Sequence, residues 1–480
     1  MNAFFAAWFL AMVPVLAYPE PQGAKPSADS LAAKYQLTAS RIITAALAGN
    51  DGYRKLEDLC LTIGHRLSGS PQLEKAIDWA MAEMKKDGHE SVRREKVMVP
   101  HWVRGRESAT MLEPRAEELH MLGLGGSVGT PPEGITAEVL VVASKEELDA
   151  AGDKAKGKIV LFNNVMPPYD PQTGSGYGKA VHFRGRGAIY AAEKGAVACL
   201  VRSVTAKSLR SPHTGGMGYR DAPVKIPAAA ISVEDADTIA RLQAKGVKVV
   251  VNLKMEAKSL PDAESANVVG ELRGSTLPDE IVIISGHLDS WDVGHGAHDD
   301  GGGCVMAMEA INVLRKLKLT PKRTIRVVLW TNEENGLAGG KTYAADHESE
   351  LPKHVAAIES DSGVFTPTGY SLECLDKDRE AVALEQMHDI ARLLTSIGPM
   401  NIDTGHSGAD VGAMKPGGVI LMGHSVEGST YFDYHHTFAD TIDKIDAKKL
   451  DQNIAVMAVV AYVLADMPVR LGEIPVPSSP

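Results

Sequence analysis

The residues with the clearest potential for chemistry are histidines and acids that follow short apolar runs in the second half of the chain. In sequence order they are His287 and Asp289, Asp299 and Asp300, Glu333 and Glu334, Asp361, and His435 and His436. Each pattern alone has an ordinary explanation as a solvated turn, but neighbouring glutamates at the end of a buried strand are costly unless cations or hydrogen bonds compensate. Imidazole and carboxylate ligands together suit a borderline metal such as zinc. The set predicts a two-metal hydrolytic site, in which a bridging carboxylate holds two ions around one water.

Most of these candidates follow apolar segments that are expected to be strands. Residues 280–285, 324–330, 355–359 and 418–422 are continuous apolar runs, typical of strands that are buried on both faces. A Gly-rich loop after the first run leads into an amphipathic helix at residues 305–317. Strands that alternate with helices predict a largely parallel sheet, whose ligands bind beyond the carboxyl ends of the strands. Most of the candidates lie at or just beyond such an end.

The first half of the chain has a different pattern. Residues 27–87 are mainly helical, and a helix at 72–84 is preceded by Ser70 as its cap and Pro71 at its first position. Strands at 95–99 and 109–112 follow. From residue 122 to 254, short β-rich runs alternate with Gly-rich turns and two helical stretches, without clustered acids or histidines. We interpret this block as an inserted accessory domain; the alternative is one continuous large sheet that includes it.

The composition is that of a folded globular protein with more than one domain. The 480 residues exceed the usual size of a single core, and 44% of them are hydrophobic and 23% are charged. A net charge of −11 argues against nucleic acid as a partner, because phosphate binding needs clustered cations. The four cysteines, Cys60, Cys199, Cys304 and Cys374, match no zinc-ribbon or redox pattern, and their pairing stays open.

The N-terminus predicts the cellular location. Residues 4–17 form an apolar run that is too short for a bilayer and fits the core of a signal peptide, with the small residues Val15 and Ala17 before a cleavage point near Tyr18. The alternative is a buried first helix. No later stretch is apolar and long enough to span a membrane. We therefore expect a secreted or periplasmic protein without a membrane span in its mature form.

Five motifs closely resemble those of the carboxypeptidase Q (plasma glutamate carboxypeptidase) family. They are Ser285-Gly-His-Leu-Asp-Ser-Trp-Asp-Val-Gly, Asp299-Asp-Gly-Gly-Gly, Leu329-Trp-Thr-Asn-Glu-Glu, Glu359-Ser-Asp and His435-His-Thr-Phe-Ala-Asp-Thr. Segments that begin at Gly129, Ser211 and Ile226 look like the protease-associated domain of the same family. These proteins are co-catalytic zinc exopeptidases of the aminopeptidase-like group, and the resemblance spans nearly the whole chain after residue 17.

The resemblance implies the ligands of two zinc ions per subunit. Asp299 is expected to bridge the ions. His287 and Asp361 are expected to complete the ligands of one ion, and Glu334 and His436 those of the other.

The same resemblance implies the catalytic residues. Glu333 is expected to act as the base, and Asp289 as the acid that supports a metal-bound imidazole. His436 is preferred to His435 as a ligand, because it begins the His-Thr-x-x-Asp-Thr pattern of the wider group.

Four further residues near the site are less clearly placed. His295 and His298 match no metal position of the family and are interpreted as loop residues. A direct role of His406 and Asp410, in a loop that often lies near the family's site, is left open.

A cis peptide bond after the bridging aspartate, before Asp300, is also expected from the resemblance.

The predicted architecture is an α/β fold with a mixed, mainly parallel sheet flanked by helices, of the zinc aminopeptidase type, and an inserted β-rich protease-associated domain. The expected division is a signal peptide at 1–17, the first part of the peptidase domain at 18–121, the insertion at 122–258 and the catalytic zinc peptidase domain at 259–480.

The predicted function is hydrolysis of dipeptides or short peptides with free termini by a water that two zinc ions activate. An aminopeptidase that acts on longer peptides is the first alternative. A non-enzymatic receptor on the same fold is less favoured, because such proteins usually lack some of the ligands. Another zinc exopeptidase group with similar motifs carries its extra domain after the Glu-Glu strand, whereas this chain carries it before His287. The resemblance also implies a homodimer.

Overall fold

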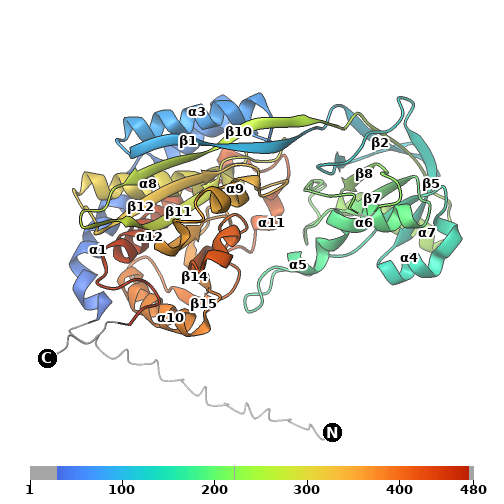
Figure 1. Ribbon diagram of the computed structural model, residues 1–480. Coiled ribbons are helices and arrows are strands. Elements are labelled where there is room, and N and C mark those ends of the chain that lie inside the picture. The colour runs from blue at the N-terminus through green and yellow to red at the C-terminus, as the bar shows by residue number, and fades with distance from the viewer. Residues whose placement is uncertain (1–29, 221, 475–480) are drawn as a thin grey trace, which may run out of the picture.

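The computed structural model describes residues 30–220 and 222–474, so the predicted signal peptide lies outside the described residues. Two eight-stranded sheets organise this part of the chain. Figure 1 shows them in two separate lobes, which a long two-stranded ribbon joins.

The first sheet belongs to the larger lobe. In spatial order its strands are β1 (Glu90–Val103), β10 (Lys258–Leu272), β12 (Arg323–Trp330), β11 (Leu277–His287), β13 (His354–Glu359), β16 (Leu421–Val426), β14 (Pro367–Glu373) and β15 (Asn401–Thr404). The four central strands β12, β11, β13 and β16 are parallel, and the strand next to them on each side, β10 or β14, is antiparallel to its central neighbour. This arrangement confirms the predicted mixed, mainly parallel sheet.

Helices cover both faces of this sheet. The helices of this lobe are α1 (Leu31–Leu47), α2 (Gly52–Asp58), α3 (Pro71–Lys86), α8 (Gly302–Lys316), α9 (Ala338–Asp346), α10 (Lys377–Ala391), α11 (Tyr431–Tyr434) and α12 (Ala447–Asp466). Side chains of β11 alternate between the faces: Val282 and Ile284 join the core under α8 and α12, whereas Ile281 and Ile283 join the core under α9. Burial on both faces explains why the strand is a continuous apolar run.

The second sheet forms the smaller lobe, which we call the accessory domain. In spatial order its strands are β3 (Glu117–Leu119), β2 (Glu107–Glu113), β9 (Val250–Met255), β5 (Ile135–Val142), β6 (Ile159–Phe162), β7 (Ala198–Arg202), β8 (Ala228–Ile231) and β4 (Met121–Gly123). Its helices are α4 (Lys145–Ala151), α5 (Tyr177–Ala180), α6 (His182–Glu193) and α7 (Val233–Ala244). The alternative of one continuous sheet is wrong, because the two sheets are separate throughout the described chain. The strand β2 precedes residue 122 but belongs here, because it pairs with β9.

The ribbon between the lobes consists of β1 and β10. These strands pair along their whole length, from Glu90 opposite Glu271 to Val103 opposite Lys258. Figure 1 shows the ribbon running from the top of the larger lobe towards the accessory domain. The chain therefore enters and leaves the accessory domain at one junction.

Three smaller features complete the description of the fold. In the described residues, no helix is both long and apolar enough to cross a membrane. The four cysteines are buried and unpaired, and Cys304 packs in the core as a residue of α8. The side chain of Ser70 caps α3 by accepting the backbone N–H of Leu73.

Candidate metal centre

The five predicted ligands meet beyond the carboxyl ends of the central strands, where β11, β12 and β13 end. Asp299 lies in the turn before α8, and its Oδ1 is 3.2 Å from Nε2 of His287. Its other oxygen, Oδ2, is 3.2 Å from Nε2 of His436. Asp361 Oδ1 lies 3.4 Å from Nε2 of His287, and Glu334 Oε2 lies 3.1 Å from Nε2 of His436. Asp299 thus stands between two groups of ligands, one on each carboxylate oxygen.

The chemistry of these side chains fits two metal ions. Four of their buried atoms lack a hydrogen-bond partner among the described residues: Nε2 of His287, Oδ2 of Asp299, Oε1 of Glu334 and Oδ1 of Asp361. Buried polar atoms are almost always paired, so a cluster of unpaired ones that face each other indicates a bound group. Two imidazoles and three carboxylates are donors that zinc accepts.

Hydrogen bonds on the far side of each imidazole ring leave Nε2 free for a metal. Nδ1 of His287 lies 3.0 Å from the backbone oxygen of Asp289, and Nδ1 of His436 lies 3.2 Å from the backbone oxygen of Thr214. A carbonyl oxygen only accepts, so Nδ1 of His287 donates and its Nε2 presents its lone pair to the carboxylates. Nδ1 of His436 also lies 3.4 Å from Nη1 of Arg184, which only donates, and the shorter distance to the carbonyl favours donation to Thr214. The carboxylate of Asp289 is 3.9 Å from Nδ1 of His287, so its backbone takes the hydrogen bond.

The carboxylate of Asp289 instead holds the turn that carries the two glutamates. It accepts the backbone N–H of Glu333 at 3.0 Å and that of Glu334 at 3.4 Å. Asn332 begins this turn with a left-handed backbone (φ 69°), and its side chain donates to Ser68 at 3.0 Å. Asp289 therefore sets the direction in which the two neighbouring glutamates leave the backbone.

Two further acids support the ligands from behind, and sequence reasoning gave them no such role. Asp300 accepts the backbone N–H of His287 at 3.0 Å. Asp440 accepts the backbone N–H groups of His298 and Asp299 at 2.7 and 3.1 Å. The signal for Asp440 was its place in the last motif, four residues after His436. The peptide bond between Asp299 and Asp300 is cis, as expected.

His435 lies beside the predicted ligand, not in its place. Its ring stacks on that of His436 with centroids 3.5 Å apart, and its Nε2 is 3.8 Å from Oδ2 of Asp299. Ligand atoms of these three residues also lie close enough to hold an ion. The shorter distances to Asp299 and Glu334 favour His436 as the ligand.

The structure also places the four residues near the site that the sequence placed less clearly. His298 is fully buried, and its ring stacks between Phe365 and a tyrosine of α11, so it is a packing residue. His295 hydrogen-bonds to backbone groups of the segment after α11. His406 lines the cavity in front of the ligands, whereas Asp410 is buried outside it and accepts the backbone N–H of Gly340.

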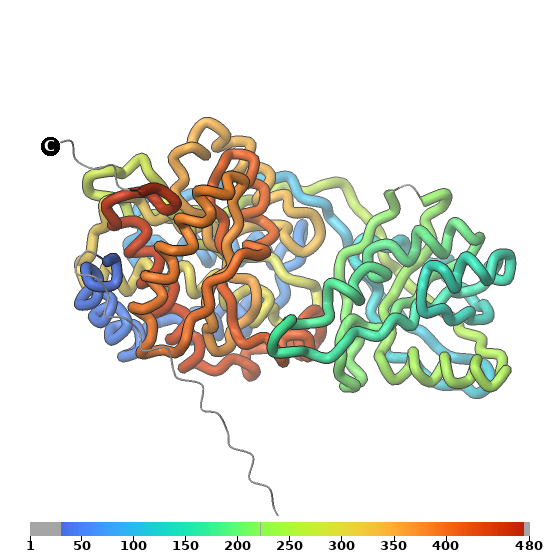
Figure 2. The backbone as a smooth tube through the Cα atoms, turned by 90° about the horizontal axis from the view of Figure 1, so that it is seen from below, coloured from blue at the N-terminus to red at the C-terminus, as the bar shows by residue number. Residues whose placement is uncertain are grey.

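A cavity of about 570 Å³ lies in front of the ligands, and residues of both lobes line it. Figures 1 and 2 show α5 and the loop before it reaching from the accessory domain towards the larger lobe. There the ring of Tyr177 stacks on that of Phe432 with centroids 4.6 Å apart. Arg184 donates to the Tyr177 hydroxyl at 2.6 Å, and its buried Nε has no partner in the described structure. Sequence reasoning missed these residues because the inserted block lacks clustered acids and histidines.

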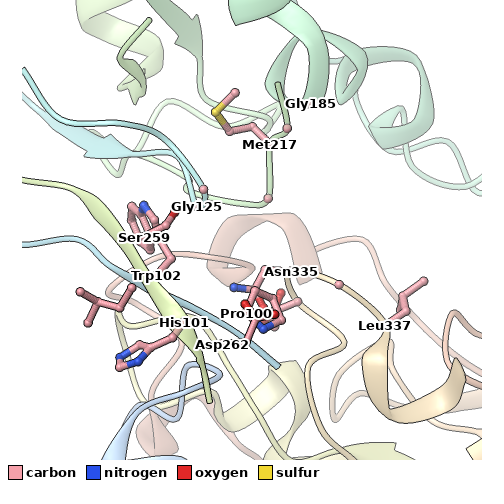
Figure 3. A pocket seen from close by; sticks show the side chains of 16 residues that line it. Pro100, His101, Trp102, Gly125, Gly185, Met217, Ser259, Asp262, Asn335 and Leu337 are labelled. Carbon is pink, nitrogen blue, oxygen red and sulfur yellow. The ribbon is translucent and has the colours of Figure 1, made fainter. Parts of the chain in front are cut away.

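A second cavity, of about 620 Å³, lies at the junction of the lobes. Figure 3 shows Trp102, Gly125, Met217 and Asn335 among the residues that line it. Glu334 is the single metal-ligand candidate on its wall. This cavity is therefore a neighbour of the metal centre and not its substrate face.

Burial and mutual repulsion oppose ionisation of the clustered carboxyl groups. Burial raises the pKa of Glu334 to about 7, and the charge of Asp299 adds to this effect. Burial also raises the pKa of Glu333 well above its ordinary value, together with the charges of Asp361 and Glu334. Burial opposes charge on His436, but Glu334 and Asp299 outweigh it and raise its pKa to about 9. A bound cation would relieve this repulsion.

Comparisons with known proteins agree with this geometry. The profile of peptidase family M28 matches residues 267–461, and that of the PA domain matches residues 135–239. Carboxypeptidase Q of Mus musculus is 45% identical over 438 residues, which cover 91% of this chain and 90% of that protein. The Homo sapiens protein of the same name is 44% identical over 432 residues, which cover 89% of this chain and 89% of that protein.

A solved structure shares the fold over nearly the whole chain. The crystal structure of a peptidase M28 precursor from Shewanella amazonensis SB2B matches with a TM-score of 0.86 and 39% identity. The match covers 93% of this chain and 99% of that one. Together with a site that fits two metal ions, these relationships show that the chain is a metallopeptidase similar to carboxypeptidase Q and belongs to peptidase family M28.

Proposed function

We propose that the protein is an exopeptidase that binds two zinc ions per subunit and hydrolyses dipeptides or short peptides with free termini. The principal observation is that Asp299 stands between His287 and His436 at the wall of a cavity that both lobes enclose. A volume of about 570 Å³ falls in the range of small-ligand sites. The carboxypeptidase Q relatives, which match along nearly the whole chain, support the same function.

Glu333 is the residue that moves the proton. When bound, two zinc ions would polarise a water molecule and the scissile carbonyl. Glu333 lines the cavity beside Glu334, and its raised pKa suits a group that takes a proton near neutral pH. It accepts a proton from the attacking water and passes it to the leaving amine. Asp289 holds the backbone of both glutamates and so keeps the base aimed at the cavity.

Arg184 supplies the means to recognise a free terminus. It is the one lysine or arginine among the cavity-lining residues of the described structure, and its Nε is unpaired. A guanidinium close to bound cations is unfavourable unless an anion lies between them, and a carboxylate matches the guanidinium fork. We therefore place the carboxylate of the substrate against Arg184.

Turnover of defined peptides tests the proposed function. Free dipeptides, C-terminally amidated dipeptides and N-acetylated dipeptides are compared with longer peptides, and zinc per chain is measured alongside. The expected result is two zinc ions per chain and fastest turnover of peptides with both termini free. Equal or faster release of single residues from the N-termini of long peptides would instead establish the aminopeptidase alternative.

The variant Arg184→Gln tests the carboxylate contact. Loss of a hydrogen bond to a charged group costs about 1.5–3 kcal/mol, so kcat/KM for free dipeptides should fall about tenfold to a hundredfold. Amidated dipeptides should lose much less. The matched control is Arg186→Gln, because Arg186 is exposed on the same helix, α6. An equal loss for free and amidated dipeptides would contradict the proposed contact.

Export and assembly complete the proposal. The apolar run at residues 4–17 is proposed to direct secretion, with cleavage near Tyr18. N-terminal sequencing of the exported protein should therefore begin close to that residue. The homodimer that the resemblance implies is tested by the molecular mass in solution.

A further inference from the structure

Backbone hydrogen bonds from the accessory domain hold His436 on the side that faces away from the metal centre. Thr214, between β7 and β8, donates its N–H to the backbone oxygen of His436 at 3.0 Å. Its carbonyl accepts Nδ1–H of the His436 ring at 3.2 Å. His436 has a left-handed backbone (φ 61°), a conformation that non-glycine residues keep where surrounding contacts hold it. Thr214 therefore contacts both the backbone and the ring of this ligand, and Nη1 of Arg184 lies 3.4 Å from the same ring nitrogen.

Thr214 is held in turn by an ion pair between the lobes. Its side chain is fully buried, donates to the backbone oxygen of Gly123 at 2.8 Å and accepts from Nη2 of Arg104 at 3.3 Å. Arg104 directly follows β1, and Asp292 lies in the larger lobe, after β11. The guanidinium and the carboxylate make two bonds, Nε to Oδ2 at 2.8 Å and Nη2 to Oδ1 at 2.5 Å. The two side chains are only 10% and 16% exposed.

The surrounding packing leaves this network little freedom. Arg104 also donates to Glu107 and to the backbone of Gly123, so all of its nitrogens are engaged. A Cβ on Gly125 would lie 2.0 Å from the indole of Trp291, which shows how closely the accessory domain approaches the larger lobe. The indole centroid is 5.7 Å from that of the His436 ring. The guanidinium of Arg104 lies over the ring of Trp102. Trp102 and Gly125 both line the cavity at the junction of the lobes (Figure 3).

We propose that the Arg104–Asp292 pair is a positioning device that sets the affinity of the metal ion bound by His436. The pair touches neither the metal nor the cavity; it acts through Thr214, whose carbonyl orients the imidazole. Nδ1 of the other imidazole, that of His287, donates to the backbone oxygen of Asp289 within the larger lobe and makes no contact with the accessory domain. The accessory domain thereby completes one metal site and leaves the other unaffected. The inference rests on the proposed two-zinc function, but its test measures metal affinity and not turnover.

The experiment is a zinc titration of the full chain carrying Asp292→Asn. This substitution keeps the shape of the side chain and removes its charge. Zinc per chain is measured by elemental analysis across a series of chelator concentrations. One ion should bind as in the wild type, and the Kd of the other should rise by up to about tenfold, the lower end of the effect of losing a direct outer partner, because Asp292 acts through Thr214. Thr214→Val, which keeps the backbone contacts, should shift the same ion by less.

The matched control is Glu256→Gln. Glu256 pairs with Arg106 at 2.6 Å at the same junction, but these side chains are 51% and 90% exposed and contact no ligand of the centre. Both ions should bind this variant as they bind the wild type.

Two outcomes would overturn the inference: wild-type affinity for both ions in Asp292→Asn, or equal weakening of both in a protein whose circular dichroism is unchanged. If Asp292→Asn does not fold, the zinc titration of Thr214→Val decides by the same criterion. A wild-type chain that binds fewer than two zinc ions would contradict the proposed function itself.

Discussion

The two neighbouring glutamates of the metal centre have different surroundings. Oε2 of Glu334 lies 3.1 Å from the imidazole of His436, so this carboxylate belongs to the ligand group. Glu333 lines the cavity without such a contact in the described structure, and burial raises its pKa well above the ordinary value. Successive side chains leave a turn in different directions, and Asp289 fixes that turn. This difference supports the proposal that Glu334 binds a metal ion and Glu333 transfers the proton.

Substitution of each glutamate should separate these two roles. Glu333→Gln should keep both zinc ions and lose about 10²–10⁴-fold in kcat, the usual worth of a positioned acid–base group. Its KM should change little, because proton transfer belongs to the transition state. Glu334→Gln should weaken or lose one zinc ion, and activity with it. Zinc analysis and kinetics of both purified variants check this, and a zinc-depleted Glu333→Gln protein would show that the roles are reversed.

Sequence patterns predicted that several of the proposed ligands lie together, because His287, Glu334 and Asp361 follow strands that apolar runs already reveal. Ends of neighbouring parallel strands meet at one edge, so His287, Glu334 and Asp361 had to lie close together. Arg184 and Thr214 could not be predicted in this way. They come from the accessory domain, and only the packing of the two lobes brings them to the site.

At the scale of elements, the close approach of α8 to the central sheet positions Asp299, the proposed bridging ligand. A Cβ on Gly303, in the first turn of α8, would lie 2.0 Å from the backbone oxygen of Ser360, just after β13. It would also lie 2.5 Å from the carboxylate of Asp300, which supports His287. Glycine at this position lets the helix begin directly beneath the metal centre.

Gly303→Ala should therefore damage both stability and metal binding. Overpacking of a well-packed core costs about 1–3 kcal/mol, and here the nearest atom belongs to the backbone and cannot move aside easily. Denaturant unfolding and zinc titration measure the two effects. The control is Gly412→Ala, because a Cβ at Gly412 meets no atom within 4 Å. Unchanged stability and zinc affinity in Gly303→Ala would contradict the close approach.

The sequence revealed the fully buried strands more readily than the partly exposed ones. The central strands are apolar because helices cover both of their faces, so β11, β12 and β13 were predicted in place. The fourth was predicted at residues 418–422, whereas β16 spans Leu421–Val426. The strand β10 was missed because residues 258–262 are exposed and include Pro261, and its pairing with β1 is long-range. The strand β14 begins with Pro367 and contains Gly369, so no apolar run marks it. Strands that flank the buried centre of a sheet, such as β10 and β14, depend on their partners more than on their own composition.

At the scale of the whole molecule, several buried histidines that lie outside the predicted ligand set stay neutral in the folded chain. His89, His354 and His424 are 7%, 1% and 3% exposed. Burial lowers the pKa of each to about 4. Their ring nitrogens hydrogen-bond to neutral groups; Nε2 of His424, for example, lies 2.6 Å from the side-chain oxygen of Asn453. Charging any of them would place an uncompensated cation in the core.

Acid should therefore destabilise the protein through these histidines. The folded pKa, about 4, lies below the unfolded value of about 6.5, so the unfolded chain takes up protons that the folded chain cannot. The stabilisation is complete above pH 6.5 and is lost as the pH falls through 4. For His424 alone, the loss between pH 7 and pH 5 is about 2 kcal/mol. Denaturant unfolding of His424→Gln at both pH values measures it: the variant should be less stable than the wild type at pH 7, and the difference should shrink by that amount at pH 5. The exposed residue His388 provides the control, since His388→Gln should leave the pH dependence of stability unchanged. Subtracting each variant from the wild type at the same pH also removes the contribution of the metal centre, so a constant difference for His424→Gln would show that this ring does not govern the acid response.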